Sequence, residues 1–174
     1  VNLHLQLYDI LRHRLIYKGY SRSDKQREDL NDLVLSELNL ISHNSYKSFE
    51  SAKLHLLFQA TYYLNSGNYK SALRDYEELI FLFEKNPHLM LNPPIYYLDA
   101  LQGILESLHT AGLYNDMPFF IEKLEKLNKH EYTTEFKMEI QWLIYIYQLI
   151  SLLNTGKFDE AYHLFTLHSG ELYK

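Results

Sequence analysis

The chain contains no cysteine, only six glycines and four prolines, and no block of charge of one sign. The absence of cysteine excludes disulfides, thiolate metal sites and cysteine nucleophiles, and it favours a reducing compartment, so we expect a cytoplasmic location. With little glycine and proline and 47% hydrophobic residues, the chain does not have the composition of a disordered protein. Its 174 residues are expected to form one folded domain with a substantial core.

Charge and hydropathy argue against two kinds of partner. The formal net charge is −5, and the chain lacks the basic stripe that would neutralise nucleic-acid phosphates, so no nucleic acid is expected to bind. The most apolar run, 140–153, is shorter than the roughly 20 residues that span a bilayer, and Gln141, Gln148 and Ser151 interrupt it. This run predicts a buried helix and no membrane insertion. The chain starts at Val1 instead of Met, so one interpretation is that the sequence is a fragment of a longer array of helical repeats.

Apolar residues recur at helical spacing along nearly the whole chain. The pattern predicts an all-α domain over residues 1–174, with about eight helices in four hairpins, at about 3–41, 48–85, 93–128 and 133–168. The expected caps and breakers are the polar, glycine and proline residues between these stretches: Gly19, Ser23, Ser45 or Ser48, Asn68, Asn86-Pro87, Asn92 and Thr133 or Thr134.

Three glycines occupy the same place in a repeated pattern of large and small residues. Around Gly67 the pattern comprises Leu56, Ala60, Tyr63, Tyr69, Ala72, Tyr76 and Leu79. The same offsets from Gly112 give Leu101, Leu105, Leu108, Tyr114, Met117, Ile121 and Leu124, and those from Gly156 give Tyr145, Leu149, Leu152, Phe158, Ala161 and Phe165. We expect a left-handed backbone at Gly67, between two helices, and buried side chains at Ala72 and Ala161.

The set Tyr63, Gly67, Tyr69, Ala72 and Tyr76 resembles the tetratricopeptide repeat, and the resemblance extends over about residues 48–173. It implies αα-hairpins stacked into a right-handed superhelix. The chain departs from the family in period, because Gly67 and Gly112 are 45 residues apart and Gly112 and Gly156 are 44 apart, against about 34 in the family. A large residue, Met117, also stands where the second hairpin should have a small one.

The resemblance also implies a binding surface, because the first helix of each hairpin lines the concave face of such an array. The positions that should project there form a polar band in one helix and an apolar band in another. The predicted partner-binding groove consists of Asp99, Gln102, Glu106, His109, Leu143, Ile146, Ile150 and Leu153. None of these residues is Lys, Arg or Asn, so a ligand with an acidic or C-terminal carboxylate group is disfavoured.

Three residues of the polar band, Asp99, Glu106 and His109, could be metal ligands or a general acid and base. The alternative is a solvated helix face, which we favour. His163 and His168 are five residues apart, about 140° round a helix at ~100° per residue, so they do not form a zinc-binding pair on one face. We therefore expect no catalysis, no metal and no cofactor.

The expected function is a protein-interaction scaffold that binds a protein or peptide, and the alternative is a ligand- or peptide-sensing module of a larger regulatory protein. The predicted helix 133–155 is apolar on all sides, so something should cover the face formed by Leu143, Ile146, Ile150 and Leu153. A further repeat, the tail 170–174, a second copy of the chain and the ligand are the candidates. Self-association through this helix is therefore one expected interaction.

Overall fold

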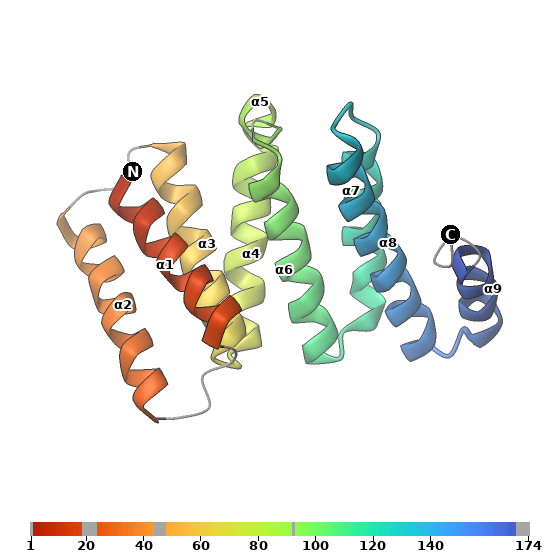
Figure 1. The fold of residues 1–174 in the computed structure, drawn as a ribbon, viewed down its shortest axis with the longest axis horizontal. Coiled ribbons are helices and arrows are strands. Elements are labelled where there is room, and N and C mark those ends of the chain that lie inside the picture. The colour runs from red at the N-terminus through yellow and green to blue at the C-terminus, as the bar shows by residue number, and fades with distance from the viewer. Residues whose placement is uncertain (1, 19–23, 44–47, 92, 170–174) are drawn as a thin grey trace. The chain divides into compact units, whose positions relative to one another are not determined.

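The computed structural model describes residues 2–18, 24–43, 48–91 and 93–169 (Figure 1). These residues form nine α-helices and one short 3-10 helix, and no strand is present among them. The all-α prediction is confirmed at this level. The chain divides into two compact units, residues 1–103 and 104–174, and the division falls inside helix α6 (Ile95–Ala111).

The first unit contains α1 (Asn2–Lys18), α2 (Asp24–His43), α3 (Phe49–Asn65), α4 (Tyr69–Glu84), α5 (Pro87–Met90) and the beginning of α6. Helix α1 packs against both α2 and α3, and α3 packs against α4. Apolar side chains at helical spacing form the core between these helices. Its fully buried members include Leu11, Leu54, Leu57, Phe58 and Phe83.

The second unit contains the rest of α6, the 3-10 helix η1 (Tyr114–Asp116), α7 (Met117–Asn128), α8 (Thr134–Asn154) and α9 (Phe158–Ser169). Helix α8 packs against α7, α9 and η1, so it is the central helix of the unit (Figure 1). Within the described residues, no helix has the length and apolar character needed to cross a membrane.

The three repeated glycines form the same turn three times. Gly67, Gly112 and Gly156 have φ of +80°, +74° and +77°, so the left-handed backbone predicted at Gly67 is confirmed. After α3, the amide of Asn68 donates a hydrogen bond of 2.9 Å to Tyr63 O. This bond spans five residues, as the outer hydrogen bond of a Schellman helix end does. The matching bonds at the other two turns, from Leu113 to Leu108 O and from Lys157 to Leu152 O, are also 2.9 Å long.

Several predicted caps are present. The hydroxyl oxygen of Ser48 accepts from the Ser51 amide at 3.2 Å, and that of Thr133 accepts from the Phe136 amide at 3.4 Å. The side chain of Asn68 caps α4 in the same way. Four other predicted caps and breakers lie outside the described residues: Gly19, Ser23, Ser45 and Asn92.

The described residues contain one α-helix more than the predicted number of about eight, because the stretch after α4 forms the four-residue helix α5. Pro87 ends α4 but is the first residue of α5, a position that proline accepts because the first amides of a helix have no partner within it. Within the predicted hairpin 93–128, the 3-10 helix η1 comes before the second helix, α7, which begins at Met117.

The small residues of the repeat are buried as predicted. Ala72 is 0% exposed and Ala161 is 2% exposed, so both α4 and α9 approach their neighbours along a side chain that takes little room. The corresponding residue of the second hairpin, Met117, is also 0% exposed. A large residue at this place is therefore accommodated in the core of the second unit.

Candidate functional site

Two residues of the predicted groove, Asp99 and Gln102, lie in the first unit, and Asp99 is engaged by the chain itself. Asp99 is half-buried, and Arg12 Nη1 of α1 lies 3.4 Å from its Oδ2. The neighbouring Tyr8 is buried, and its pKa is raised by burial and by the charge of Asp99. Gln102 is exposed. Helix α1 thus supplies an internal partner for the acidic residue at the start of the predicted polar band.

The polar residues of the groove in the second unit also have contacts within that unit. Glu106 Oε2 accepts a hydrogen bond of 3.3 Å from Tyr147 Oη of α8, and the His109 ring centre lies 6.1 Å from that of Tyr114. In the described part of the chain, no group of three or more His, Asp or Glu side chains is placed to hold a metal ion.

Helix α8 does not present its predicted apolar face uniformly. Leu143 is buried, Ile146 and Ile150 are half-buried, and Leu153 is exposed. Leu143 therefore does not line an open groove as predicted. It belongs to a buried stripe with Ile140, Tyr147 and Ser151. Within this stripe, Tyr147 contacts α6 and Ser151 contacts η1.

Two hydrogen bonds fix that orientation of α8. One is the bond from Tyr147 to Glu106 in α6, and the other joins Ser151 Oγ to the carbonyl oxygen of Tyr114 in η1 at 3.3 Å. Both donors lie on the Leu143 side of α8. A second accessible side of α8 carries Trp142, and it is distinct from the predicted side, on which Leu153 is exposed.

The accessible side of α8 forms the base of a groove between α7 and α9, which we call the α7–α9 groove. It consists of two cavities of about 710 and 670 Å³ that share Gln148 as a lining residue. The first cavity has apolar side chains from all three helices: Ile121, Leu152 and Leu164.

Carboxylates dominate the edges of the first cavity. Glu122 and Glu125 of α7 and Asp159 and Glu160 of α9 line it, and no Lys or Arg is among its lining residues. All four side chains are exposed. Glu122 pairs with Lys126 at 2.8 Å, and the hydrogen bond and charge of Lys126 lower the pKa of Glu122. Glu125 Oε1 accepts from Gln148 Nε2 at 3.0 Å.

The second cavity is aromatic and has no Asp, Glu, Lys or Arg in its lining. Trp142 lines it with 49% of its surface exposed, and its ring centre lies 5.8 Å from that of Tyr145. His168 stacks on the other ring, Tyr145, with centres 4.7 Å apart. The α7–α9 groove therefore has an acidic end and an aromatic end.

Comparison with known proteins gives no relative for this chain. No family model, no curated protein and no solved structure matches it. The resemblance to the tetratricopeptide repeat accordingly stays a prediction, and the chemistry of the α7–α9 groove rests on its own residues.

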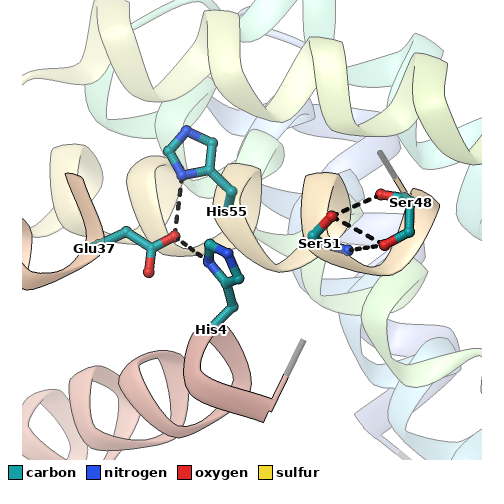
Figure 2. A network of polar contacts seen from close by, with 5 residues as sticks. All are labelled: His4, Glu37, Ser48, Ser51 and His55. Carbon is teal, nitrogen blue, oxygen red and sulfur yellow. Dashed lines mark hydrogen bonds and ion pairs between the residues drawn. The ribbon is translucent and has the colours of Figure 1, made fainter. Parts of the chain in front are cut away.

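A second polar cluster lies in the first unit, where Glu37 of α2 joins two histidines (Figure 2). Glu37 Oε1 lies 2.7 Å from His4 Nδ1 of α1 and 3.1 Å from His55 Nδ1 of α3. All three residues are buried, with Glu37 only 1% exposed. A substrate in solution cannot reach such a carboxylate, so we assign the cluster to holding α1, α2 and α3 together.

Neither the groove nor the buried cluster was found from the sequence. The sequence pattern predicts that the four carboxylates of the groove face solvent on two separate helices. They come together only because α7 and α9 both pack on α8. Glu37 and His4 are 33 residues apart, with no local motif to connect them. His163 lines the acidic cavity and His168 lines the aromatic one.

Proposed function

We propose that this chain is a protein-interaction module that binds a segment of a partner protein and catalyses no reaction. The observation that carries this proposal is the α7–α9 groove, which is open, has apolar side chains at its base and presents a half-exposed tryptophan. Tryptophan is among the residues that contribute most to binding energy at protein interfaces.

The distribution of exposed apolar side chains supports the same proposal. Of the thirteen large hydrophobic residues that are exposed in the described part of the chain, seven lie on α8 and α9: Met138, Trp142, Leu153, Phe158, Tyr162, Phe165 and Leu167. Single exposed apolar residues are common on protein surfaces, but a concentration of them marks interaction sites. The second unit is therefore the part of the chain that we expect to contact a partner.

The three equal glycine turns support the more specific proposal that the hairpins are units of the tetratricopeptide type. In this proposal α3 with α4, α6 with α7, and α8 with α9 are successive repeats, stacked as a right-handed superhelix in a cytoplasmic protein. Gln102 and Leu153, which are exposed, are the members of the originally predicted groove that remain most available to a partner.

A selection from a displayed library of random 14-residue peptides, with the full chain as the target, tests the proposed function. We expect a related family of peptides to be enriched and the synthetic peptides to shift the emission of Trp142, which is the only tryptophan of the chain. The variant Trp142→Ala should weaken binding of the labelled peptides at least tenfold. Absence of any enriched family, or peptides that bind Trp142→Ala as well as the natural chain, would overturn the proposal.

The volume of the cavities supports a second candidate, a sensing module for a small apolar ligand. Cavities of about 710 and 670 Å³ fall within the roughly 300–1,000 Å³ typical of small-molecule sites. A thermal-shift screen separates the two candidates, because a sensing module should be stabilised by a metabolite-sized compound at micromolar concentration. Stabilisation by selected peptides alone would favour the interaction module.

A further inference from the structure

We infer that the segment bound by the α7–α9 groove is basic and amphipathic, with Lys or Arg side chains at the acidic end and a large apolar side chain against Trp142. This inference rests on the proposed function, because it names the chemistry of the partner at the same groove. The two ends of the groove differ in charge and in aromatic content, so they also define the direction in which such a segment would lie.

The acidic end is lined by carboxylates. Four of them line it without a lining Lys or Arg, and Glu122 pairs with Lys126, which lies on the same helix outside the lining. Asp159 and Glu160 lie in the first turn of α9, where carboxylates also stabilise a helix through its dipole. Glu122 and Glu125 lie beyond the first turn of α7, where the dipole provides no comparable reason for an acidic residue.

The contribution of these carboxylates is to select the sign of the partner's charge. Ion pairs between exposed side chains are individually weak and are screened by salt, so they favour fast and selective association more than tight binding. The free energy of binding must come mainly from apolar contact. Half-buried Leu152 and Leu164 at the acidic end and half-exposed Trp142 at the other end offer that contact.

The length of the groove is suited to a short helix. From Met138 to Leu152, α8 advances about 21 Å at 1.5 Å per residue. A helical segment of roughly fourteen residues has the same length and can present basic and apolar side chains on one face. Its basic side chains would lie near Glu125 and Asp159, on opposite walls of the groove.

Three fluorescein-labelled peptides of fourteen residues test the inference. The first carries four Lys or Arg residues at one end and Leu and Phe at helical spacing at the other. The second has Glu in place of each basic residue, and the third has the basic residues with Ser in place of Leu and Phe. We expect the first peptide to bind at least tenfold more tightly than the other two, to shift Trp142 emission, and to weaken severalfold between 50 and 300 mM NaCl.

Charge-reversal variants locate the binding site. Glu125→Lys with Asp159→Lys should weaken binding of the basic peptide at least tenfold. The matched control, Glu77→Lys with Glu139→Lys, changes the net charge by the same amount at exposed carboxylates that do not line the groove, and it should change binding less than twofold. If the Lys variant does not fold, Glu125→Gln with Asp159→Asn removes the charge and should still weaken binding severalfold.

Equal effects of the groove variant and its control, or equal binding of the basic and acidic peptides, would overturn the inference. The proposed function would survive that result if peptides of another chemistry are selected and their binding depends on Trp142. Both proposals would fail if the library yields no binder and the basic peptide does not bind.

Discussion

At the scale of single residues, glycine has two different roles in this chain. At Gly67 the backbone is left-handed, and a Cβ atom there would have only Tyr69 Oη near it, at 3.9 Å. At Gly103, inside α6, a Cβ atom would lie 2.2 Å from Cζ of Tyr76. The first glycine is required by backbone conformation and the second by the space that a neighbouring ring occupies.

Substitution of Gly67 should therefore act through backbone strain alone. A left-handed conformation costs an L-residue roughly 1–2 kcal/mol, and more for a β-branched residue. We expect Gly67→Val to lower the free energy of unfolding by about 2 kcal/mol and Gly67→Asn by less, since asparagine tolerates this conformation better. Urea denaturation measures both values, and equal stability of Gly67→Val and the natural chain would contradict the assignment.

Gly103→Ala should be destabilising in the natural chain and stabilising when the ring of Tyr76 is absent. Tyr76 is only 3% exposed, so its ring has little room to move, and overpacking of this kind costs about 1–3 kcal/mol. In the background of Tyr76→Ala, the same change should stabilise by up to about 1 kcal/mol, because alanine is the better helix former. A double-mutant cycle in urea measures the effect of Gly103→Ala on the free energy of unfolding in both backgrounds. An effect of the same sign in both would refute the close approach of the Tyr76 ring to Gly103.

At the scale of secondary-structure elements, the cluster around Glu37 connects three helices of the first unit. Glu37 Oε2 is buried and has no hydrogen-bond partner in the part of the chain that the structure describes, so both histidine contacts depend on the other oxygen. One carboxylate oxygen thereby joins α1 and α3 to α2. The association of these helices is expected to be sensitive to the loss of this single side chain.

Glu37→Leu should destabilise the first unit substantially. Each buried polar group that loses its partner costs about 1–3 kcal/mol, and the change removes the Glu37 contact of both His4 and His55. Glu37→Gln retains an acceptor oxygen, so it should lower the free energy of unfolding by about half as much as Glu37→Leu does. Circular dichroism during urea denaturation provides the measurement. A Glu37→Leu variant as stable as the natural chain would show that the cluster does not hold the helices together.

Stability of the whole molecule should decrease in alkaline solution because tyrosines are buried in neutral form. Burial raises the pKa of Tyr76 from 10.0 to about 12, an effect opposed by its hydrogen bond with Thr61 and supported by the charge of Asp99. Burial also raises the pKa of Tyr8 and Tyr97. Between pH 10 and 12 the unfolded chain releases protons that the folded chain retains, so the free energy of unfolding falls as the pH rises.

The expected loss from Tyr76 alone is on the order of 2 to 3 kcal/mol, since one pKa unit corresponds to about 1.4 kcal/mol. This loss of free energy of unfolding is absent well below pH 10 and complete well above pH 12. Urea denaturation at pH 8, 10 and 11, with tyrosinate absorption recorded in parallel, measures it. Tyr76→Phe should show a shallower decline than the natural chain, and identical declines would contradict the burial of a neutral Tyr76 hydroxyl.

The amino-acid sequence by itself was sufficient to predict eight of the helices, the caps at Ser48, Asn68 and Thr133, and the three glycine turns. Each of these features depends on residues within a few positions of one another. The hydrogen bond from Asn68 to Tyr63, for example, needs only a helix end followed by a residue that accepts positive φ. Helix α5 was missed for the same local reason, because Pro87 marks the end of one helix and the beginning of the next equally well.

Only the tertiary structure decided which surfaces of these helices are covered. Helix α8 is apolar on several sides, so its sequence does not indicate whether Leu143 or Trp142 remains accessible. In the structure, Tyr147 and Ser151 of this helix form hydrogen bonds with residues at least 37 positions away, and α7 and α9 pack against it. The burial of Glu37 and the grouping of four carboxylates along the α7–α9 groove likewise arise only when helices distant in sequence pack together, and no local pattern records that packing.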